Sequence, residues 1–135
     1  MSSETKNKFS LKKRLQSFKH AFHGIFITFR TQHNAWIHCL AIVFVLALGF
    51  TFHVTTTEWF VLFLCTGMVL SAEIFNTSIE HLVDFISPEY NEKAGHIKDL
   101  SAAAVLITAI VSAIIGLWIF IPKVNAIITS WSSID

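Results

Sequence analysis

Three carboxylates follow an apolar run in the middle of the chain. The segment SAEIFNTSIEHLVDF comes directly after WFVLFLCTGMVL and carries Glu73, Glu80 and Asp84. On a helix these side chains point within about 40° of one another, and Asn76 lies one turn from Glu73 on the flank of the same face. A carboxylate at membrane depth costs several kcal/mol, so this face is predicted to turn toward a protein interior or a polar cleft. Asp84, at the end of the segment, is expected to be simply solvated.

Like charges gathered on such a face repel one another unless a cation neutralises them. A hard divalent ion such as Mg²⁺, bound through one or two carboxylates and phosphate oxygens, resolves that conflict. The acidic face therefore indicates a site for a magnesium ion and a phosphate-bearing ligand.

A second polar cluster lies at the start of the last apolar run. In SPEYNEKAGHIKDLSAAAVLI, Ser87 and Pro88 mark a turn and the start of a helix. That helix carries a group of polar side chains before it enters the membrane: Glu89, Tyr90, Asn91, Glu92, His96, Lys98 and Asp99. The Lys98–Asp99 pair has two interpretations that the sequence leaves open. It is either a structural salt bridge, or an ammonium for a phosphate and a carboxylate for a metal.

Composition and apolar runs predict an all-α integral membrane protein with an N-terminal amphipathic surface helix and three transmembrane helices. The chain is 53% hydrophobic and 14% charged, which is too apolar for a soluble domain of 135 residues. A bilayer core of about 30 Å needs about 20 apolar residues per helix. The predicted segments are a flexible N-terminus at 1–9, a membrane domain at 10–123 and a C-terminal tail at 124–135. Within the membrane domain we expect a surface helix at about 10–31 and membrane helices at about 34–53, 58–84 and 98–121.

The distribution of Lys and Arg predicts the orientation in the membrane. Seven of the ten precede the first apolar run, and Lys93 and Lys98 lie in the loop that returns to the same side. Because Lys and Arg concentrate on the cytoplasmic side, the N-terminus of this multi-pass protein is expected to be cytoplasmic. Only Lys123 is left on the opposite side.

The segment before the first apolar run has its apolar residues at helical spacing. They fall within an arc of about 100°: Leu11, Leu15, Phe18, Phe22, Ile25, Phe26 and Phe29. The basic residues lie off this apolar stripe. Either the stripe lies in the lipid interface or it packs against the membrane helices, and both alternatives place the basic side chains at the boundary between membrane and cytosol.

Two carboxylates, an amide, a Lys–Asp pair and a basic interfacial helix at one membrane surface suit transfer of a phosphoryl group to a lipid hydroxyl. That reaction asks mainly for a general base, a metal and positive charge around the phosphates. No Walker A motif is present and the five glycines form no Gly-rich loop. An ordinary soluble kinase is therefore excluded, and no nucleic-acid partner is expected.

These motifs resemble the signature of the prokaryotic diacylglycerol kinase family, which includes the undecaprenol kinases. Residues 72–107 contain Glu-x-x-Asn-x-x-x-Glu, then Glu-Tyr, then Lys-Asp followed by a run of small residues. The stretch RTQHNAWIH before the first apolar run is similar to another family element. The resemblance covers about residues 10 to 121.

The resemblance implies a homotrimer in the cell inner membrane, with active sites between subunits, that uses MgATP to phosphorylate a lipid alcohol, either diacylglycerol or undecaprenol. It implies that Glu73 is the general base, that Asn76 orders the site, and that Glu80 holds the metal and ATP. The other ATP contacts implied by the resemblance are Lys13, His20, Glu89, Tyr90, Asn91, Lys98 and Asp99.

The main departure from the family pattern is Gln32, which stands where the family usually has a metal-binding Glu. A neutral amide oxygen coordinates Mg²⁺ but attracts it less strongly than a carboxylate does. Gln32 therefore predicts lower metal affinity or lost activity. Asn91 also replaces a commoner His. The core set is retained: Glu73, Asn76, Glu80, Lys98 and Asp99.

Two alternatives to an active lipid kinase remain. A small membrane protein that binds metal or moves ions would use the same buried carboxylates, and the seven His residues favour that alternative. However, the His pairs lack the repeated close spacing of membrane metallo-oxidases, and His38 is expected to pack at the membrane interface. The second alternative is a catalytically inactive relative, marked by Gln32.

Overall fold

Four α-helices make up the described part of the chain, which comprises residues 10–89 and 91–132 of a computed structural model. They are α1 (Leu11–Thr31), α2 (His33–Thr51), α3 (Thr56–Ile86) and α4 (Glu92–Ser132). Three of them, α2, α3 and α4, are long and apolar enough to cross a membrane. The predicted fold class, an all-α membrane protein with an N-terminal amphipathic helix, is confirmed. The predicted flexible segment 1–9 lies outside the described residues.

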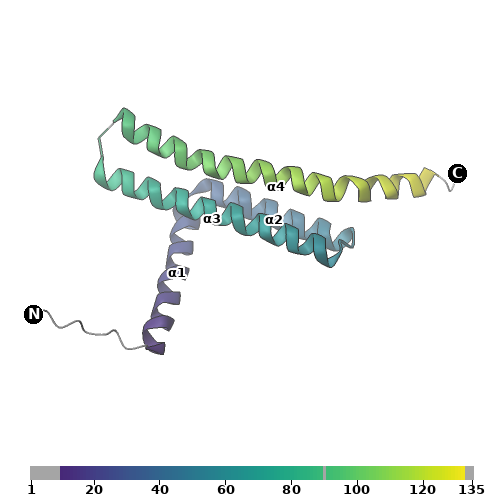
Figure 1. Ribbon diagram of the computed structural model, residues 1–135, viewed down its shortest axis with the longest axis horizontal. Coiled ribbons are helices and arrows are strands. Elements are labelled where there is room, and N and C mark those ends of the chain that lie inside the picture. Colours follow the sequence, from purple (N-terminus) through teal and green to yellow (C-terminus); the bar gives the residue numbers. More distant parts are fainter. Residues whose placement is uncertain (1–9, 90, 133–135) are drawn as a thin grey trace, which may run out of the picture.

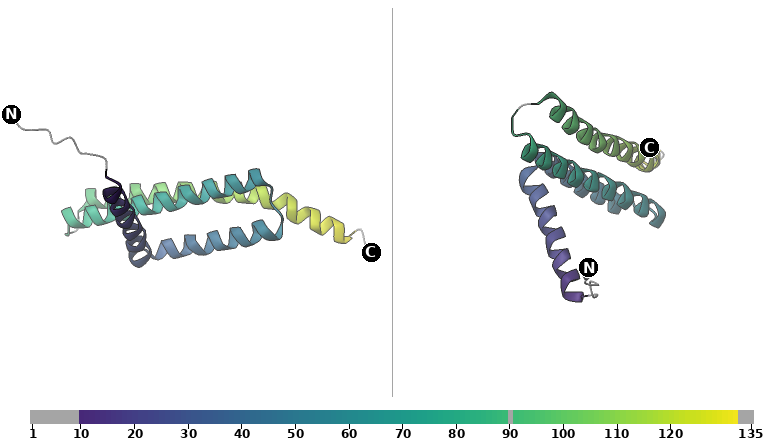
Figure 2. Two further views of the ribbon diagram at one scale, coloured as in Figure 1. Left: turned by 90° about the horizontal axis from the view of Figure 1, so that it is seen from below. Right: turned by 60° about the vertical axis from the view of Figure 1, so that its left-hand side comes forward.

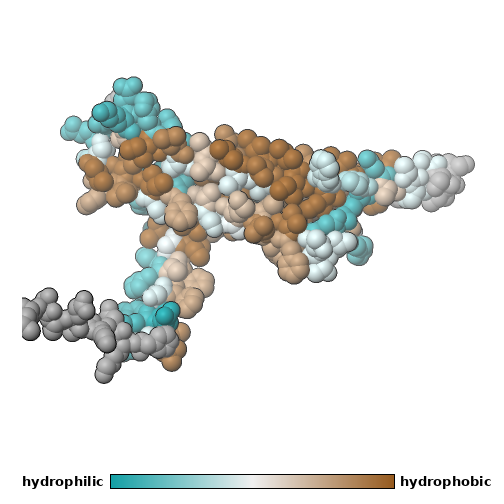
Figure 3. Space-filling model, in the orientation of Figure 1, coloured by the Kyte–Doolittle hydropathy of each residue, from teal (hydrophilic) through white to brown (hydrophobic). Residues whose placement is uncertain are grey.

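The helix α3 is the innermost of the three membrane helices. In its most apolar window 33% of the residues are buried, against 11% in α2 and in α4. Figures 1 and 2 show α4 running antiparallel to α3, with α2 alongside α3. Most large apolar side chains of these helices are exposed, and they form the brown surface in Figure 3. Exposed apolar surface of this kind is expected of helices that have lipid as their solvent.

The turn between α2 and α3 is stabilised by a capping box. The Thr55 hydroxyl accepts a hydrogen bond from the Glu58 backbone N–H at 3.3 Å, and the Glu58 carboxylate accepts one from the Thr55 N–H at 2.6 Å. Lys123 of α4 pairs with the same carboxylate at 3.0 Å. A small core of Val54, Leu62 and Phe120 lies beside this turn. These contacts align α3 with α4 at the end opposite the acidic face.

The elbow between α1 and α2 consists of Gln32, whose extended backbone (φ −107°, ψ 115°) separates the two helices. The Trp36 indole donates a hydrogen bond to the Phe29 carbonyl at 2.8 Å, and the two rings meet edge to face at 5.7 Å. From this elbow α1 projects away from the other helices (Figure 1). Its apolar stripe from Leu11 to Phe26 is exposed, so the chain's own membrane helices do not cover it.

The last helix is longer than the sequence predicts. It begins at Glu92, where the Asn91 side chain accepts hydrogen bonds from the backbone N–H groups of Lys93 (2.9 Å) and Ala94 (3.3 Å). It continues through Pro122 to Ser132. The expected helix end at residue 121, with a tail at 124–135, is therefore wrong as far as Ser132. Proline removes one backbone donor, and membrane helices tolerate it, so Pro122 does not end α4.

Gly49 of α2 leaves room for the Trp59 ring at the start of α3. A methyl group added there would lie 2.5 Å from Trp59 Cη2, whereas one added at Gly116 meets nothing within 4 Å. Alanine favours a helix by about 1 kcal/mol over glycine, but overpacking costs about 1–3 kcal/mol. We expect Gly49→Ala to melt at a lower temperature than Gly116→Ala in detergent, measured by thermal unfolding. Equal melting temperatures would show that the Trp59 ring moves freely aside.

Candidate active site

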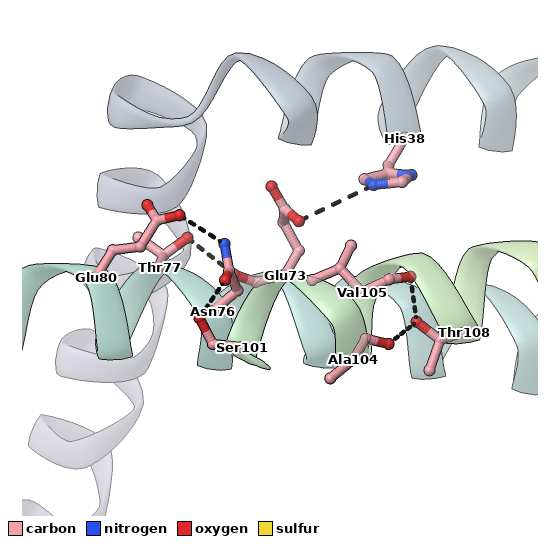
Figure 4. A network of polar contacts seen from close by, with 9 residues as sticks. All are labelled: His38, Glu73, Asn76, Thr77, Glu80, Ser101, Ala104, Val105 and Thr108. Atoms are coloured by element: carbon pink, nitrogen blue, oxygen red, sulfur yellow. Dashed lines mark hydrogen bonds and ion pairs between the residues drawn. The ribbon is translucent and has the colours of Figure 1, made fainter. Parts of the chain in front are cut away.

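The Glu73 carboxyl is buried between the membrane helices. Only 1% of the residue is exposed, and within the described residues its two oxygens are the buried side-chain atoms that lack a hydrogen-bond partner. It faces His38 of α2, whose Nε2 lies 3.9 Å from Oε2 (Figure 4). Buried polar groups are nearly always hydrogen-bonded, and an exception calls for an explanation such as a catalytic role. The inward orientation expected for Glu73 is observed.

A hydrogen-bonded network begins at Glu80, two turns further along α3. Glu80 Oε1 accepts a hydrogen bond from Asn76 Nδ2 at 3.0 Å, and Asn76 Oδ1 accepts one from Ser101 Oγ of α4 at 2.6 Å. Ser101 Oγ also lies 2.8 Å from the Lys98 carbonyl. Asn76 and Ser101 are both buried. The network thus ties the acidic face of α3 to the start of α4 (Figure 4).

Gln32 closes this network from the other side. Its Nε2 donates a hydrogen bond to Glu80 Oε2, so the side chain that could have capped α2 is directed at α3 instead. The extended backbone at the elbow makes this possible, because it turns Gln32 out of both helices. The structure therefore brings together Gln32 and Glu80, the two residues that the family resemblance assigns to the metal.

Lys98 pairs with Asp84 and not with its neighbour Asp99. The Lys98 Nζ lies 2.6 Å from Asp84 Oδ1, and the two side chains are 37% and 64% exposed. Consecutive residues on a helix point about 100° apart, so Lys98 and Asp99 do not face each other. The salt bridge within the Lys98–Asp99 pair, one of the two interpretations left open, is not formed. Asp84 is solvated as expected, although it also has an ion-pair partner.

A cavity of about 240 Å³ separates Glu73 from α2 and α4. Its polar lining consists of Glu73, Asn76, Asn34 and His38. The rest of the lining is apolar: Ile37, Ala102, Val105, Leu106 and Ala109. The cavity beside the buried carboxyl thus has few polar groups, which suits an apolar molecule with one hydroxyl.

A family model described as prokaryotic diacylglycerol kinase matches residues 19–120. The chain belongs to this family. The match includes both the Glu73 cavity and the Glu80 network, and it confirms the resemblance seen in the sequence.

Relatives of the chain are named as lipid kinases. An undecaprenol kinase from Bacillus subtilis is 42% identical over 113 residues, which cover 84% of this chain and 92% of that protein. A diacylglycerol kinase from Synechocystis is 35% identical over 109 residues, 80% of this chain and 62% of that protein. A diacylglycerol kinase from Escherichia coli K12 is 49% identical over 47 residues, 35% of this chain and 38% of that protein.

The residues that the family resemblance assigns to ATP are spread over three places. Lys13 and His20 are exposed on the half of α1 that projects away from the other helices. Glu89 is exposed before α4, and the Asn91 side chain caps that helix. Tyr90 lies outside the described residues. Lys98 lies at the Glu80 end of the acidic face, where it pairs with Asp84, and Asp99 is exposed.

Two residues of the site were not predicted from the sequence. His38, which the sequence predicts to pack at the membrane interface, faces Glu73 with 19% of its side chain exposed. Ser101 belongs to the run of small residues that follows Lys98 and Asp99, and its hydroxyl donates a hydrogen bond to Asn76. A helical signal exists for each: His38 lies one turn after Asn34, and Ser101 one turn after Lys98. Helical spacing alone did not show which side chains these residues would meet on other helices.

The side chains at Glu80 carry oxygen ligands that fit a magnesium ion arriving with a nucleotide. One carboxylate and the amide oxygen of Gln32 are oxygen ligands of the kind Mg²⁺ prefers, with the remaining positions left for phosphates and water. In the described part of the chain no three His, Cys, Asp or Glu side chains gather as a metal group. The residues present therefore suit a shared nucleotide–metal site better than a metal site made by protein alone.

Proposed function

We propose that the protein transfers the γ-phosphate of ATP to the hydroxyl of a membrane lipid alcohol. Membership in a family of lipid kinases supports the general reaction. The observation that carries the proposal is the buried Glu73 carboxyl, which has no hydrogen-bond partner and lies beside the Glu80–Asn76–Ser101 network. A carboxyl placed this way is free to bind and deprotonate an alcohol, whereas a purely structural carboxyl would be satisfied by the protein.

In this proposal Glu73 is the general base. It accepts the proton of the lipid hydroxyl while the hydroxyl oxygen forms its bond to the γ-phosphorus and ADP leaves. Asn76 and Gln32 hold both oxygens of Glu80 in place. Lys98, half-exposed at the same end of the helices, places a positive charge where phosphates would enter.

The residues that would hold Mg²⁺ are Glu80 and, through its amide oxygen, Gln32. When bound with ATP, the ion neutralises charge on the phosphates. Of these two, only Glu80 brings a formal charge, which is the physical reason to expect weak metal binding.

We also propose that the protein works as a homotrimer, with sites between subunits. Lys13 and His20 belong to α1, which projects away from the other helices (Figure 1), and a neighbouring subunit would bring these side chains to the nucleotide. The exposed apolar stripe of α1 would lie in the cytoplasmic interface of the inner membrane. This arrangement keeps the basic N-terminus in the cytoplasm.

The proposal is tested by offering the purified protein γ-labelled ATP, Mg²⁺ and each lipid alcohol in mixed micelles. We expect labelled phosphate in the lipid fraction, with the product identified after extraction. Undecaprenol is the first acceptor to test, because the relative matched over 92% of its length is an undecaprenol kinase; diacylglycerol is the second. A folded protein that labels neither lipid would favour the inactive relative or the ion-handling protein.

Replacing Gln32 by Glu should lower the Mg²⁺ concentration needed for half-maximal transfer. The substitution exchanges a hydrogen-bond donor to Glu80 for a second carboxylate, and two facing carboxylates bind a divalent cation more strongly than one. Without Mg²⁺ the variant should be less stable to heat than the wild type, because the two charges then repel each other. Titration of activity and melting temperature with Mg²⁺ tests both points. If the Mg²⁺ concentration needed for half-maximal transfer is unchanged, residue 32 is not a ligand of the metal.

A further inference from the structure

His38 and Glu73 face each other without forming a hydrogen bond. His38 Nε2 and Glu73 Oε2 are 3.9 Å apart, which is beyond the range of a direct hydrogen bond. A polar contact of this length suggests an atom between the two groups. A separation of 3.9 Å is short enough for a single hydroxyl oxygen, once it enters between the two helices, to form hydrogen bonds of about 2.8 Å with both groups. Figure 4 shows both side chains directed toward the same gap from α2 and α3.

His38 also stands at the junction of two cavities. The cavity of about 240 Å³ beside Glu73 and a larger one of about 460 Å³ share His38 and Ala109 as lining residues. The larger cavity lies between α2, α3 and α4 and is lined almost entirely by apolar side chains such as Leu48, Leu62 and Phe120. A cavity with a few polar groups next to a larger, mainly apolar one matches a lipid alcohol, which has one hydroxyl on a long hydrocarbon tail.

We propose that His38 is a second contact to the acceptor hydroxyl, opposite Glu73. This inference rests on the proposed lipid kinase function. The hydroxyl donates its hydrogen bond to Glu73 Oε2 and accepts one from the Nε2–H of His38. Two contacts orient the oxygen, whereas Glu73 alone would leave it free to rotate about a single hydrogen bond.

The reaction itself does not change the protonation of His38. As the acceptor oxygen bonds to the γ-phosphorus, its O–H bond breaks and the proton passes to Glu73, while the bond from phosphorus to ADP breaks. His38 keeps its proton and holds the oxygen on the line of attack. It therefore positions the substrate, and any residue with a hydrogen-bond donor at this point should replace it in part.

Two substitutions at His38 separate this role from simple packing and from charge pairing. His38→Phe keeps a ring of similar size but removes the donor, and His38→Gln keeps a neutral donor. In the mixed-micelle assay we expect His38→Phe to lower kcat/KM for the lipid by about 10- to 100-fold, the effect of one buried hydrogen bond to a reacting group, with KM for ATP unchanged. His38→Gln should recover most of that loss. Leu40→Met, a change of similar volume on the exposed side of the same helix and outside both cavities, is the control and should match the wild type.

Each other result would overturn the inference. A fully active His38→Phe would show that His38 only packs, and equal losses in His38→Gln and His38→Phe would show that Glu73 needs a cationic partner. A raised KM for ATP with an unchanged kcat/KM for the lipid would show that His38 acts on nucleotide binding. If His38→Phe does not elute as the wild type does, His38→Leu provides the same comparison. A wild-type protein that labels no lipid would instead reject the proposed function, and the inference with it.

Discussion

Glu73→Gln should lower phosphate transfer to lipid by about 10²- to 10⁴-fold, the usual contribution of a general base. Glutamine has almost the same shape as glutamate, so the cavity between α2, α3 and α4 keeps its size. Its amide, however, takes up no proton from the lipid hydroxyl. Because neither Glu73 oxygen accepts a hydrogen bond from the described part of the protein, the substitution breaks none, and we expect the variant to fold and melt as the wild type does.

The measurement is the initial rate of label transfer at saturating ATP, with a parallel determination of KM for ATP. A base predicts a lower kcat and an unchanged KM for ATP. Asp84→Asn is a matched control, because Asp84 lies on the same face of α3 but is 64% exposed and should affect the rate only slightly. A wild-type rate in Glu73→Gln would rule out Glu73 as the base. A raised KM for ATP with unchanged kcat would place Glu73 on the nucleotide or its metal.

Lys98→Met should lower kcat/KM for ATP by about 10²- to 10³-fold, the range seen when one group that stabilises charge in the transition state is removed. Methionine keeps the unbranched apolar stem and removes the ammonium. The Lys98–Asp84 ion pair is solvent-exposed, and exposed ion pairs contribute little to stability. A large loss of activity would therefore have to come from contact with phosphates and not from a weakened fold.

The partner Asp84 distinguishes the two roles of Lys98 that the sequence leaves open. Asp84→Asn breaks the same ion pair but leaves the ammonium in place, so we expect activity close to the wild type. Exchanging the two residues, with Asp84→Lys and Lys98→Asp in one chain, restores the ion pair and moves the charge. Under a structural role the exchanged protein regains activity, and under phosphate binding it stays as inactive as Lys98→Met. Kinetics with varied ATP and a melting curve of each variant decide between them.

The sequence was sufficient to predict the membrane helices and the face of α3 that carries the candidate site. Apolar runs of membrane length identify α2, α3 and α4, and the 3.6-residue period places Glu73, Asn76 and Glu80 on neighbouring directions of α3. The cost of a charge in lipid then requires that Glu73 point inward, as observed at 1% exposure. These predictions succeed because they depend on one helix and its solvent only. The end of α4 was missed because proline weakens a helix without always ending it.

Only the tertiary structure decided which side chains meet across helices. The pairs Gln32–Glu80, Ser101–Asn76 and Lys98–Asp84 each join different segments, and none follows from spacing within a helix. Helical period gives the direction of a side chain around its own axis. It does not give which helix lies opposite, nor how far two helices slide along each other.

His38 shows the same limit most clearly. Its place near the start of an apolar run predicts a residue at the membrane interface. The packing of α2 against α3 turns it toward Glu73, whose buried carboxyl has no hydrogen-bond partner among the residues that the structure describes. The amino-acid sequence therefore determined that a charged group must be hidden inside this membrane protein. The packing of the helices determined what faces that group, because the alignment and rotation of each helix depend on contacts along its whole length.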